Sequence, residues 1–288
     1  MSENHAPAVV VTGASTGIGY AVAQTALKRG ARVFGSVRKQ GDAQRLASAF
    51  GPAFTPLLFD VTNQRAVSEA AARVAQSIGR GRLLGLVNNA GVAVPAPLLH
   101  QPIGDFRRQI ETNLTGQLIV TQAFAGLLGA DRSRTGNPGR IVMISSVNGR
   151  IGSPFLGAYS ASKHALEGMS ESLRRELMVY GIDVVIVGPG AVATPIWDKA
   201  LELDLSPYKD TDYAEPAKKM RDYAAANKRQ GLPAEKVGAL VWEALTASRP
   251  KRRYAIVPSS FVNWTLPRLL PARMIDRIIA RRLGFPGY

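Results

Sequence analysis

Cysteine is absent from the sequence of 288 residues, and histidine occurs only three times. A chain without thiols forms neither disulfides nor thiolate metal sites, so a reducing compartment is permitted but not required. His5, His100 and His164 do not have the spacing of metal ligands, and we interpret His164, beside Lys163, as a structural residue. We therefore predict that the protein binds no metal ion.

Long apolar runs are also absent. No stretch approaches the roughly 18 apolar residues that a membrane-spanning helix requires. The N-terminal stretch MSENHAPAVVVTG has neither the basic nor the apolar region of a secretory signal. These absences predict a cytoplasmic protein.

Acidic residues are scarce, since 21 Asp and Glu stand against 36 Lys and Arg, which gives a net charge of +15. Residues 249–288 contain nine basic residues and one acid, and so carry +8 of that charge. Within this tail, 271–283 has the pattern of a helix with isoleucines on one face and arginines on the other. Such a helix would make peripheral contact with an anionic membrane, or cover a neighbouring subunit or the substrate pocket of its own chain. Alternatively, the basic residues form a solvated face. Without a recognition motif or interleaved aromatic residues, we expect no specific binding to nucleic acid.

Short apolar runs alternate with helical patterns along the rest of the chain. The runs suit strands buried on both faces of a sheet, and they span 8–12, 31–37, 53–59, 82–87, 140–145, 182–187 and 254–258. Helical patterns lie between or after them, at 17–29, 63–79, 104–128, 158–180 and 233–247. The alternation predicts a single α/β domain over residues 1–258, with a Rossmann-like, doubly wound parallel sheet and helices on both faces.

Two segments do not follow this alternation. The polar segment 194–232 comes after a strand and is predicted to be a substrate lid within the catalytic domain. Residues 259–288 are predicted to form a basic amphipathic C-terminal extension, packed on or near the domain.

A glycine-rich turn, TGASTGIG (12–19), joins the first predicted strand to the first helix. Its three glycines, Gly13, Gly17 and Gly19, permit a tight turn, an approach of backbone N–H groups to a pyrophosphate, and close packing of helix on strand. The helix N-terminus favours negative charge at the same place. The turn therefore predicts a dinucleotide site, although its spacing is not G-x-G-x-x-G; the alternative is an ordinary glycine-rich turn.

The residues after the second strand bear on the choice of dinucleotide. An acid at this strand end would bind the ribose hydroxyls and select NAD, yet Val37 occupies the expected place and Arg38 follows it. A cation suits the 2′-phosphate of NADP, so we predict that NADP(H) is preferred, with NAD(H) as the alternative. In a basic protein, Arg38 is alternatively one more surface cation.

Asp60 and the segment LVNNAG (86–91) follow the third and fourth strands. Open α/β sheets bind ligands at this edge, outside the carboxyl ends of their strands. Asp60 is suited to accept a hydrogen bond from the adenine amino group. Alternatively, it is the N-cap of the helix that follows.

Tyr159 and Lys163 lie four residues apart at the start of a helical pattern, which puts both side chains on one face. Ser146, after the fifth strand, precedes Tyr159 by thirteen residues, so its hydroxyl and the phenol can converge on one point. Pro189 and Gly190, after the sixth strand, impose an irregular backbone that would lie against a cofactor ring. Alternatively, Tyr159 and Lys163 are a buried tyrosine at the rim and a solvated lysine.

Six motifs occur in one order along residues 8–258: TGASTGIG, NNAG, the Asn113 of ETNLTG, Ser146, Tyr159-x-x-x-Lys163 and the Pro-Gly of GPGAVAT. In this combination the chain resembles the short-chain dehydrogenase/reductase family. The segment SVNGRIGSPFLGAYSASKHALEG further resembles members that act on steroids and retinoids.

The resemblance implies a role for each catalytic residue. Tyr159 would be the general acid/base, Lys163 would lower its pKa and bind the nicotinamide ribose, and Ser146 would hydrogen-bond the substrate oxygen. Asn113 would help to hold a proton-relaying water beside Lys163, and Thr194 would contact the nicotinamide carboxamide. Carried over residue by residue, the cofactor site comprises Gly13, Ser15, Thr16, Gly17, Ile18, Gly19, Arg38, Asp60, Val61, Asn89, Ala90, Gly91, Tyr159, Lys163, Pro189, Gly190, Val192 and Thr194.

The activity that follows is an NADP(H)-preferring interconversion of a secondary alcohol and a ketone, or of an alcohol and an aldehyde. The lid contains the apolar residues Ile196, Trp197, Leu201, Leu203, Leu205 and Tyr208. They favour an apolar substrate, unless they only pack the lid on the body of the protein. The resemblance also implies a homodimer or homotetramer. The alternative function is a non-catalytic, nucleotide-sensing regulator of the same fold, which would be expected to lack the Tyr/Lys pair.

Overall fold

Seven parallel strands form one sheet in the order β3-β2-β1-β4-β5-β6-β7. The computed structural model describes residues 6–258, 260 and 264–286. The strands are β1 (Ala8–Val11), β2 (Arg32–Val37), β3 (Phe54–Leu58), β4 (Gly85–Asn88), β5 (Arg140–Ile144), β6 (Asp183–Pro189) and β7 (Arg253–Ile256). β1 pairs with both β2 and β4, so the strand order reverses at β1. Ligands of open α/β sheets bind at the carboxyl ends beside such a reversal.

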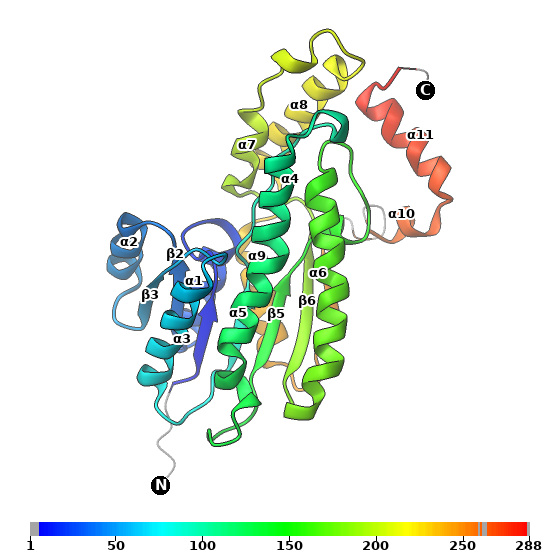
Figure 1. Cartoon of the computed structure of the whole chain (residues 1–288). Coiled ribbons are helices and arrows are strands. Elements are labelled where there is room, and N and C mark those ends of the chain that lie inside the picture. The colour runs from blue at the N-terminus through cyan, green and yellow to red at the C-terminus, as the bar shows by residue number, and fades with distance from the viewer. Residues whose placement is uncertain (1–5, 259, 261–263, 287–288) are drawn as a thin grey trace.

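Helices cover both faces of the sheet (Figure 1). One face carries α1 (Gly17–Lys28), α2 (Gln40–Phe50) and α9 (Ala234–Thr246). The other carries α3 (Gln64–Ile78), α5 (Gly116–Ala125) and α6 (Gly157–Glu176). The predicted Rossmann-like, doubly wound α/β fold is therefore confirmed, and each predicted strand is present close to its expected bounds.

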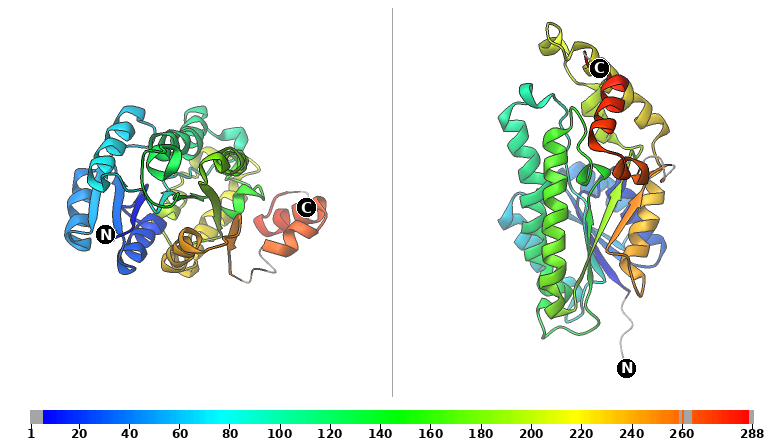
Figure 2. Two further views of the ribbon diagram at one scale, coloured as in Figure 1. Left: turned by 90° about the horizontal axis from the view of Figure 1, so that it is seen from below. Right: turned by 90° about the vertical axis from the view of Figure 1, so that its right-hand side faces the viewer.

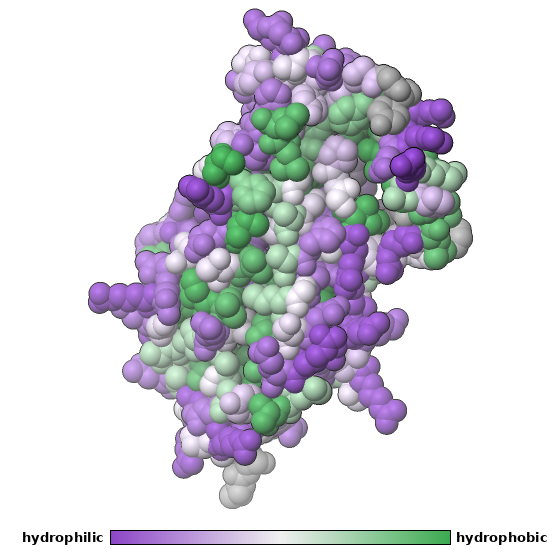
Figure 3. All heavy atoms as spheres, turned by 45° about the vertical axis from the view of Figure 1, so that its right-hand side comes forward, coloured by the Kyte–Doolittle hydropathy of each residue, from purple (hydrophilic) through white to green (hydrophobic). Residues whose placement is uncertain are grey.

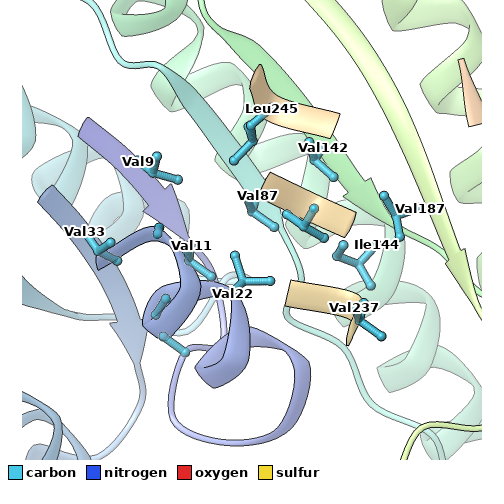
Figure 4. Close-up of a cluster of buried hydrophobic side chains, with 14 of the residues drawn as sticks. Val9, Val11, Val22, Val33, Val87, Val142, Ile144, Val187, Val237 and Leu245 are labelled. Carbon is cyan, nitrogen blue, oxygen red and sulfur yellow. The ribbon is translucent and has the colours of Figure 1, made fainter. Parts of the chain in front are cut away.

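Two apolar cores separate these layers, because successive residues of a strand point to opposite faces of the sheet. Val9 and Val11 of β1 face α1 and α9, whereas Val10 between them faces α3 and α5. Figure 4 shows the first core, where strand side chains meet those of α1 and α9: Val9, Val11, Val33, Val87, Val142, Ile144 and Val187 against Val22, Val237 and Leu245. Burial on both faces is the reason that the strands read as continuous apolar runs in the sequence.

Two helical regions differ from the prediction. No element is predicted at 40–50, yet α2 forms there; it buries only Ala43 and Leu46, which leaves almost no apolar pattern in the sequence. The predicted helix 104–128 is divided into α4 (Ile103–Ile110), a π-helical turn at Glu111–Thr115, α5, and a second π-helical turn at Gly126–Ala130. Such wide turns are frequent at functional sites.

The segment 194–232 contains the α-helices α7 (Asp198–Leu201) and α8 (Ala214–Gln230), together with 3₁₀ turns at Pro195–Trp197 and Ser206–Tyr208. Its two ends are joined, since Ala193 N donates to Leu232 O and Leu232 N donates to Ala191 O, both at 2.9 Å. The segment therefore projects from the body of the protein as one unit.

The C-terminal tail forms α10 (Leu266–Leu269) and α11 (Ala272–Leu283), which lie outside the β7 edge of the sheet (Figure 1, Figure 2). After α11, the ring of Phe285 stacks on that of Phe155 with 6.4 Å between centroids and meets the Tyr213 ring edge-on at 6.3 Å, so the tail contacts the segment 194–232. Within the described ranges, no helix is long and apolar enough to cross a membrane, and no cluster of metal ligands occurs.

Candidate active site

A cavity of about 450 Å³ opens at the carboxyl ends of the strands. Every predicted cofactor residue except Gly19 lines this cavity, and so does Ser146. Asn113, the remaining predicted catalytic residue, does not line it. The fold thus brings residues from the ends of β1 to β6 into one place.

The glycine turn has the backbone geometry that a pyrophosphate requires. Gly13 and Gly17 have φ angles of 66° and 58°, in the left-handed region that glycine adopts without strain. A Cβ atom on Gly19 would lie 2.2 Å from Gly13 O, so only glycine permits this contact of α1 with the turn. Within the described structure, the N-cap Thr16 makes no side-chain capping bond and the first turn of α1 has no acid. The N-terminus of α1 therefore fits the phosphates of a dinucleotide.

Thr12 and Asn89 hold the glycine turn in place. The Thr12 hydroxyl accepts hydrogen bonds from Asn89 N at 2.9 Å and Ala90 N at 3.0 Å. Asn89 Nδ2 donates in return to Thr12 O at 2.8 Å. The sequence analysis missed Thr12; its position directly before the first glycine is the signal that would have found it.

Arg38 and Asp60 lie next to each other at the ends of β2 and β3. Arg38 Nη1 is 3.8 Å from Asp60 Oδ2, and both side chains are exposed. Val37 is buried, so its position at the end of β2 presents no side chain to the cavity. Arg38 therefore provides the cation on this side of the cavity.

The alternative interpretation of Asp60 as a helix N-cap is wrong. Asn63 caps α3 instead, with its side chain accepting from Ala66 N at 3.0 Å. Asp60 Oδ1 accepts from Thr62 N at 3.0 Å and Thr62 Oγ1 at 2.8 Å, which fixes the carboxylate at the cavity wall.

Ser146, Tyr159 and Lys163 converge in the cavity. Lys163 Nζ lies 5.7 Å from the centroid of the Tyr159 ring and donates to Ile144 O at 2.7 Å. The Ser146 hydroxyl hydrogen-bonds the Tyr159 phenol and accepts from Asn148 N at 3.1 Å. Ser146 and Lys163 are buried, and Tyr159 is half-buried at the cavity wall.

Burial shifts the pKa values of Tyr159 and Lys163 in opposite directions, because it disfavours the negatively charged phenolate and the positively charged ammonium group. Burial raises the pKa of the Tyr159 phenol, and the hydrogen bond from Ser146 opposes this only in part. Burial lowers the pKa of Lys163 to about 8, with the Glu167 carboxylate acting in the other direction. The resemblance implies that Lys163 lowers the pKa of Tyr159, but the net shift is upward, because desolvation outweighs the hydrogen bond from Ser146.

Asn113 lies in the π-helical turn and connects the loop after β4 to α6. Its Oδ1 accepts from Val92 N at 2.8 Å, and its Nδ2 donates to Val92 O at 2.8 Å and to Ser162 Oγ at 3.0 Å. Ser162 is the neighbour of Lys163 in α6. The Asn113 side chain therefore fixes the position of this loop relative to the helix, and its part in a water relay stays a prediction.

Comparison with known proteins places this site in a family. The family model of the short chain dehydrogenases matches residues 7–203. The chain belongs to the short-chain dehydrogenase/reductase family. It is 41% identical over 274 residues to an NADPH-dependent 3-dehydrocapnine reductase of Ornithobacterium rhinotracheale, which covers 95% of this chain and 96% of the relative. It is 32% identical over 295 residues to retinol dehydrogenase 5 of Mus musculus, with 97% and 89% covered.

A solved structure supports the same assignment. The short-chain dehydrogenase from Streptomyces avermitilis has a TM-score of 0.75 to this chain at 25% identity, and the match covers 100% of both chains. As a short-chain dehydrogenase/reductase, the protein is an NAD(P)-dependent oxidoreductase.

This short-chain dehydrogenase/reductase has a buried acid beside Ser145 and Ser146, which the sequence analysis missed. Glu167 is 2% exposed and accepts from Ser145 Oγ at 2.8 Å, from Arg150 Nε, and from Arg253 Nη2 at 2.9 Å. Arg253 Nη2 also donates to Ser146 O at 3.2 Å. The sequence signal that would have found Glu167 is its position one helical turn after Lys163, on the helix face where an amphipathic pattern would place an apolar residue.

Arg45 of α2 is a second residue that the sequence analysis missed. Its Nη2 donates to Ser15 O in the glycine turn at 2.8 Å and to Asp42 Oδ1 at the same distance. In the sequence, the opposite charges of Asp42 and Arg45, three residues apart, indicate a helix at this position.

In this short-chain dehydrogenase/reductase, the segment 194–232, which is the predicted lid, lines the cavity with only two of its six predicted apolar residues. Ile196 and Trp197 line the cavity, and Trp197 Nε1 donates to Val192 O at 2.8 Å. The predicted cavity wall is wrong for the remaining four residues: Leu201 does not line the cavity, and Leu203, Leu205 and Tyr208 pack around Phe155 in a separate apolar core. Four residues of this segment without a prediction also line the cavity: Pro195, Ala200, Met220 and Tyr223.

Proposed function

We propose that the protein is an NADP(H)-preferring oxidoreductase that interconverts a secondary alcohol and a ketone, or an alcohol and an aldehyde, on an apolar substrate. The observation that carries the proposal is the convergence of Ser146, Tyr159 and Lys163 in one cavity with the glycine turn. A nicotinamide cofactor, when bound, supplies or accepts the hydride.

The proton chemistry then falls to Tyr159. Its raised pKa keeps the phenol protonated at neutral pH, so the group is ready to donate a proton to a carbonyl oxygen that receives hydride. Ser146, already hydrogen-bonded to the phenol, would hold the same oxygen. These protonation states support the reduction of a carbonyl as the direction for which the site is prepared.

Lys163 would orient the cofactor ribose. Its Nζ has three donors, one of which is used on Ile144 O. With a pKa of about 8, the group is mostly charged at neutral pH and loses its charge in mildly alkaline solution. Gly190 and Thr194 would lie beside the nicotinamide ring.

The preference for NADP(H) rests on Arg38. Its guanidinium is exposed at the cavity, and the buried Val37 offers no acid to the ribose hydroxyls. The relative from Ornithobacterium is named as NADPH-dependent, which supports the same choice. NAD(H) is the second candidate cofactor.

An apolar substrate is supported by the walls of the cavity on the lid side. Leu156, Ile196, Trp197 and Met220 line that part, so the segment 194–232 would act as the substrate lid. The relatives are named for 3-dehydrocapnine and retinol, and we propose that this chain acts on a ketone or alcohol with an apolar portion.

Assembly and location complete the proposal. We expect a cytoplasmic homodimer or homotetramer that uses the faces of helices 104–128 and 158–180. Large apolar side chains are exposed near the ends of these helices, at Leu98, Leu99, Ile103, Met178 and Val179. Figure 3 shows apolar side chains running down this side of the molecule between hydrophilic ones.

The test is a cofactor oxidation assay. The absorbance of NADPH or NADH is followed with a panel of apolar and polar ketones and aldehydes at neutral pH. We expect turnover with apolar ketones and a specificity for NADPH over NADH of at least about tenfold, as expected for loss of a charge-assisted phosphate contact. Tight NADPH binding without turnover of any carbonyl compound would instead favour the nucleotide-sensing regulator.

A further inference from the structure

A second cavity, of about 360 Å³, lies at the β7 edge of the sheet beside α6. It shares no lining residue with the active-site cavity. The strands contribute its apolar lining through Val184, Ile186 and Ala255, and the tail contributes Trp264 and Arg268. Its volume falls in the range of small-molecule sites, roughly 300–1,000 Å³.

The charges around this cavity do not balance. Five arginines line it, against a single acid, Glu171: Arg150, Arg174, Arg252, Arg253 and Arg268. Grouped guanidinium ions repel one another, and the repulsion is strongest where solvent screening is limited. An excess of cations around a concave space is therefore stabilised by a bound anion.

Two of the arginines are already held by the protein. Arg253 donates to Glu167 through Nε and Nη2, and Arg150 donates to both Glu167 and Glu171. One buried carboxylate thus serves two guanidinium ions. By contrast, Arg174 and Arg252 have no carboxylate within 4.0 Å in the part of the chain that the structure describes.

The aromatic ring of Trp264 orders the outer side of the cavity. Two guanidinium groups pack against it, with Arg253 Cζ at 4.4 Å and Arg268 Cζ at 4.7 Å from its centroid. Arg253 also passes so close to Gly188 that a Cβ there would lie 2.4 Å from Nη2. Arg253 and Arg268 are therefore fixed in place before any ligand arrives, which reduces the entropic cost of binding.

We propose that this cavity is a binding site for an organic phosphate, with Arg174 and Arg252 as the anion ligands and the Trp264 cluster as their support. Arginine suits this chemistry because its planar fork of N–H donors matches two phosphate oxygens. The site is separate from the cofactor cavity, and its occupancy does not depend on the proposed reaction.

The phosphate can come from a soluble phosphomonoester or from the headgroup of an anionic lipid. The second source is suggested by exposed apolar residues on α10 and α11 beside the cavity: Leu269, Met274 and Ile278. The experiment therefore has two arms.

In the first arm, inorganic phosphate is titrated calorimetrically at constant ionic strength, with NADPH present so that the glycine turn is occupied. In the second arm, the protein is sedimented with phosphatidylglycerol or phosphatidylcholine vesicles. Both arms compare the wild-type chain, the double variant Arg174→Ala/Arg252→Ala, and Arg175→Ala. Arg175 is the exposed neighbour of Arg174 on α6 and does not line the cavity, although it pairs with the lining residue Glu171, so its variant removes a nearby charge and leaves every lining residue in place.

Saturable phosphate binding that weakens at least about tenfold in the double variant, and not in Arg175→Ala, supports the site with a soluble ligand. Sedimentation with phosphatidylglycerol that depends on the same two arginines supports the site with a lipid headgroup. If all three proteins respond alike in both arms, the attraction is general electrostatics and the proposal is wrong. Equal NADPH affinity of the three proteins shows that each is folded.

Discussion

Replacement of Glu167 by Gln tests how the proposed catalytic residues are supported. Glu167 is a buried carboxylate on α6 that neutralises Arg253 and Arg150 and accepts from Ser145. The side chains of Glu167 and Arg253 are only 3% and 13% exposed. Gln has nearly the same shape, so the variant removes the charge without opening a cavity, and it leaves the Arg253 guanidinium buried without a counter-ion.

The expected cost is large because of that burial. Removing one partner of a buried ion pair costs about 3–5 kcal/mol, against a total stability of roughly 5–15 kcal/mol for a folded protein. Glu171, one helical turn further on, is the matched control. It pairs with Arg150 and Arg175 but is 42% exposed, so Glu171→Gln should cost less than about 1 kcal/mol.

Urea unfolding of both variants at neutral pH, with equal m values, measures the difference. Glu167→Gln should also lower kcat, because Arg253 Nη2 donates to Ser146 O and would lose its anchor. Equal free energies of unfolding for the two variants would refute the argument that burial of Glu167 gives this cluster its strength.

Three further predictions follow from the site. Burial lowers the pKa of Lys163 from 10.5 to about 8, so between these pH values the unfolded chain binds more protons than the folded one. The free energy of unfolding therefore rises with pH over this range, by about 3 kcal/mol in all. Urea unfolding of Lys163→Met should lack this rise, and an equal rise in the variant would contradict the prediction. Gly19→Ala places a Cβ 2.2 Å from Gly13 O and should abolish NADPH binding measured by fluorescence, whereas Gly41→Ala, with no heavy atom within 4 Å of its Cβ, should leave binding unchanged. Arg38→Ala should raise the KM for NADPH at least about tenfold and leave that for NADH unchanged; parallel changes in both would show that Arg38 does not select the cofactor.

Local patterns made the sheet and most of the cavity predictable from the sequence. Strands buried on both faces appear as apolar runs in the sequence, and the ligand-binding residues of a parallel sheet lie at the carboxyl ends of its strands. From the sequence alone, these two rules place the glycine turn, Ser146 and the pair Tyr159–Lys163 at the same edge of the sheet. Every predicted cofactor residue except Gly19 lines the cavity for this reason.

Features that depend on tertiary packing were not predictable in the same way. Glu167 and Arg253 are 86 residues apart, and their pairing depends on how β7 packs beside α6. Leu203 and Tyr208 are apolar lid residues like Ile196, but only the fold decides that they turn toward Phe155 rather than toward the cavity. The upward shift of the Tyr159 pKa likewise results from desolvation of the phenol, which the spacing of Tyr159 and Lys163 in the sequence does not reveal.

The most direct test of the proposed chemistry is the turnover of Tyr159→Phe with NADPH and an apolar ketone, measured beside its NADPH affinity. The variant keeps the ring and removes the hydroxyl that would donate the proton. We expect kcat to fall by about 100-fold or more, as for loss of a general acid, with NADPH affinity nearly unchanged. Turnover close to that of the wild-type enzyme would contradict the assignment of Tyr159 as the proton donor.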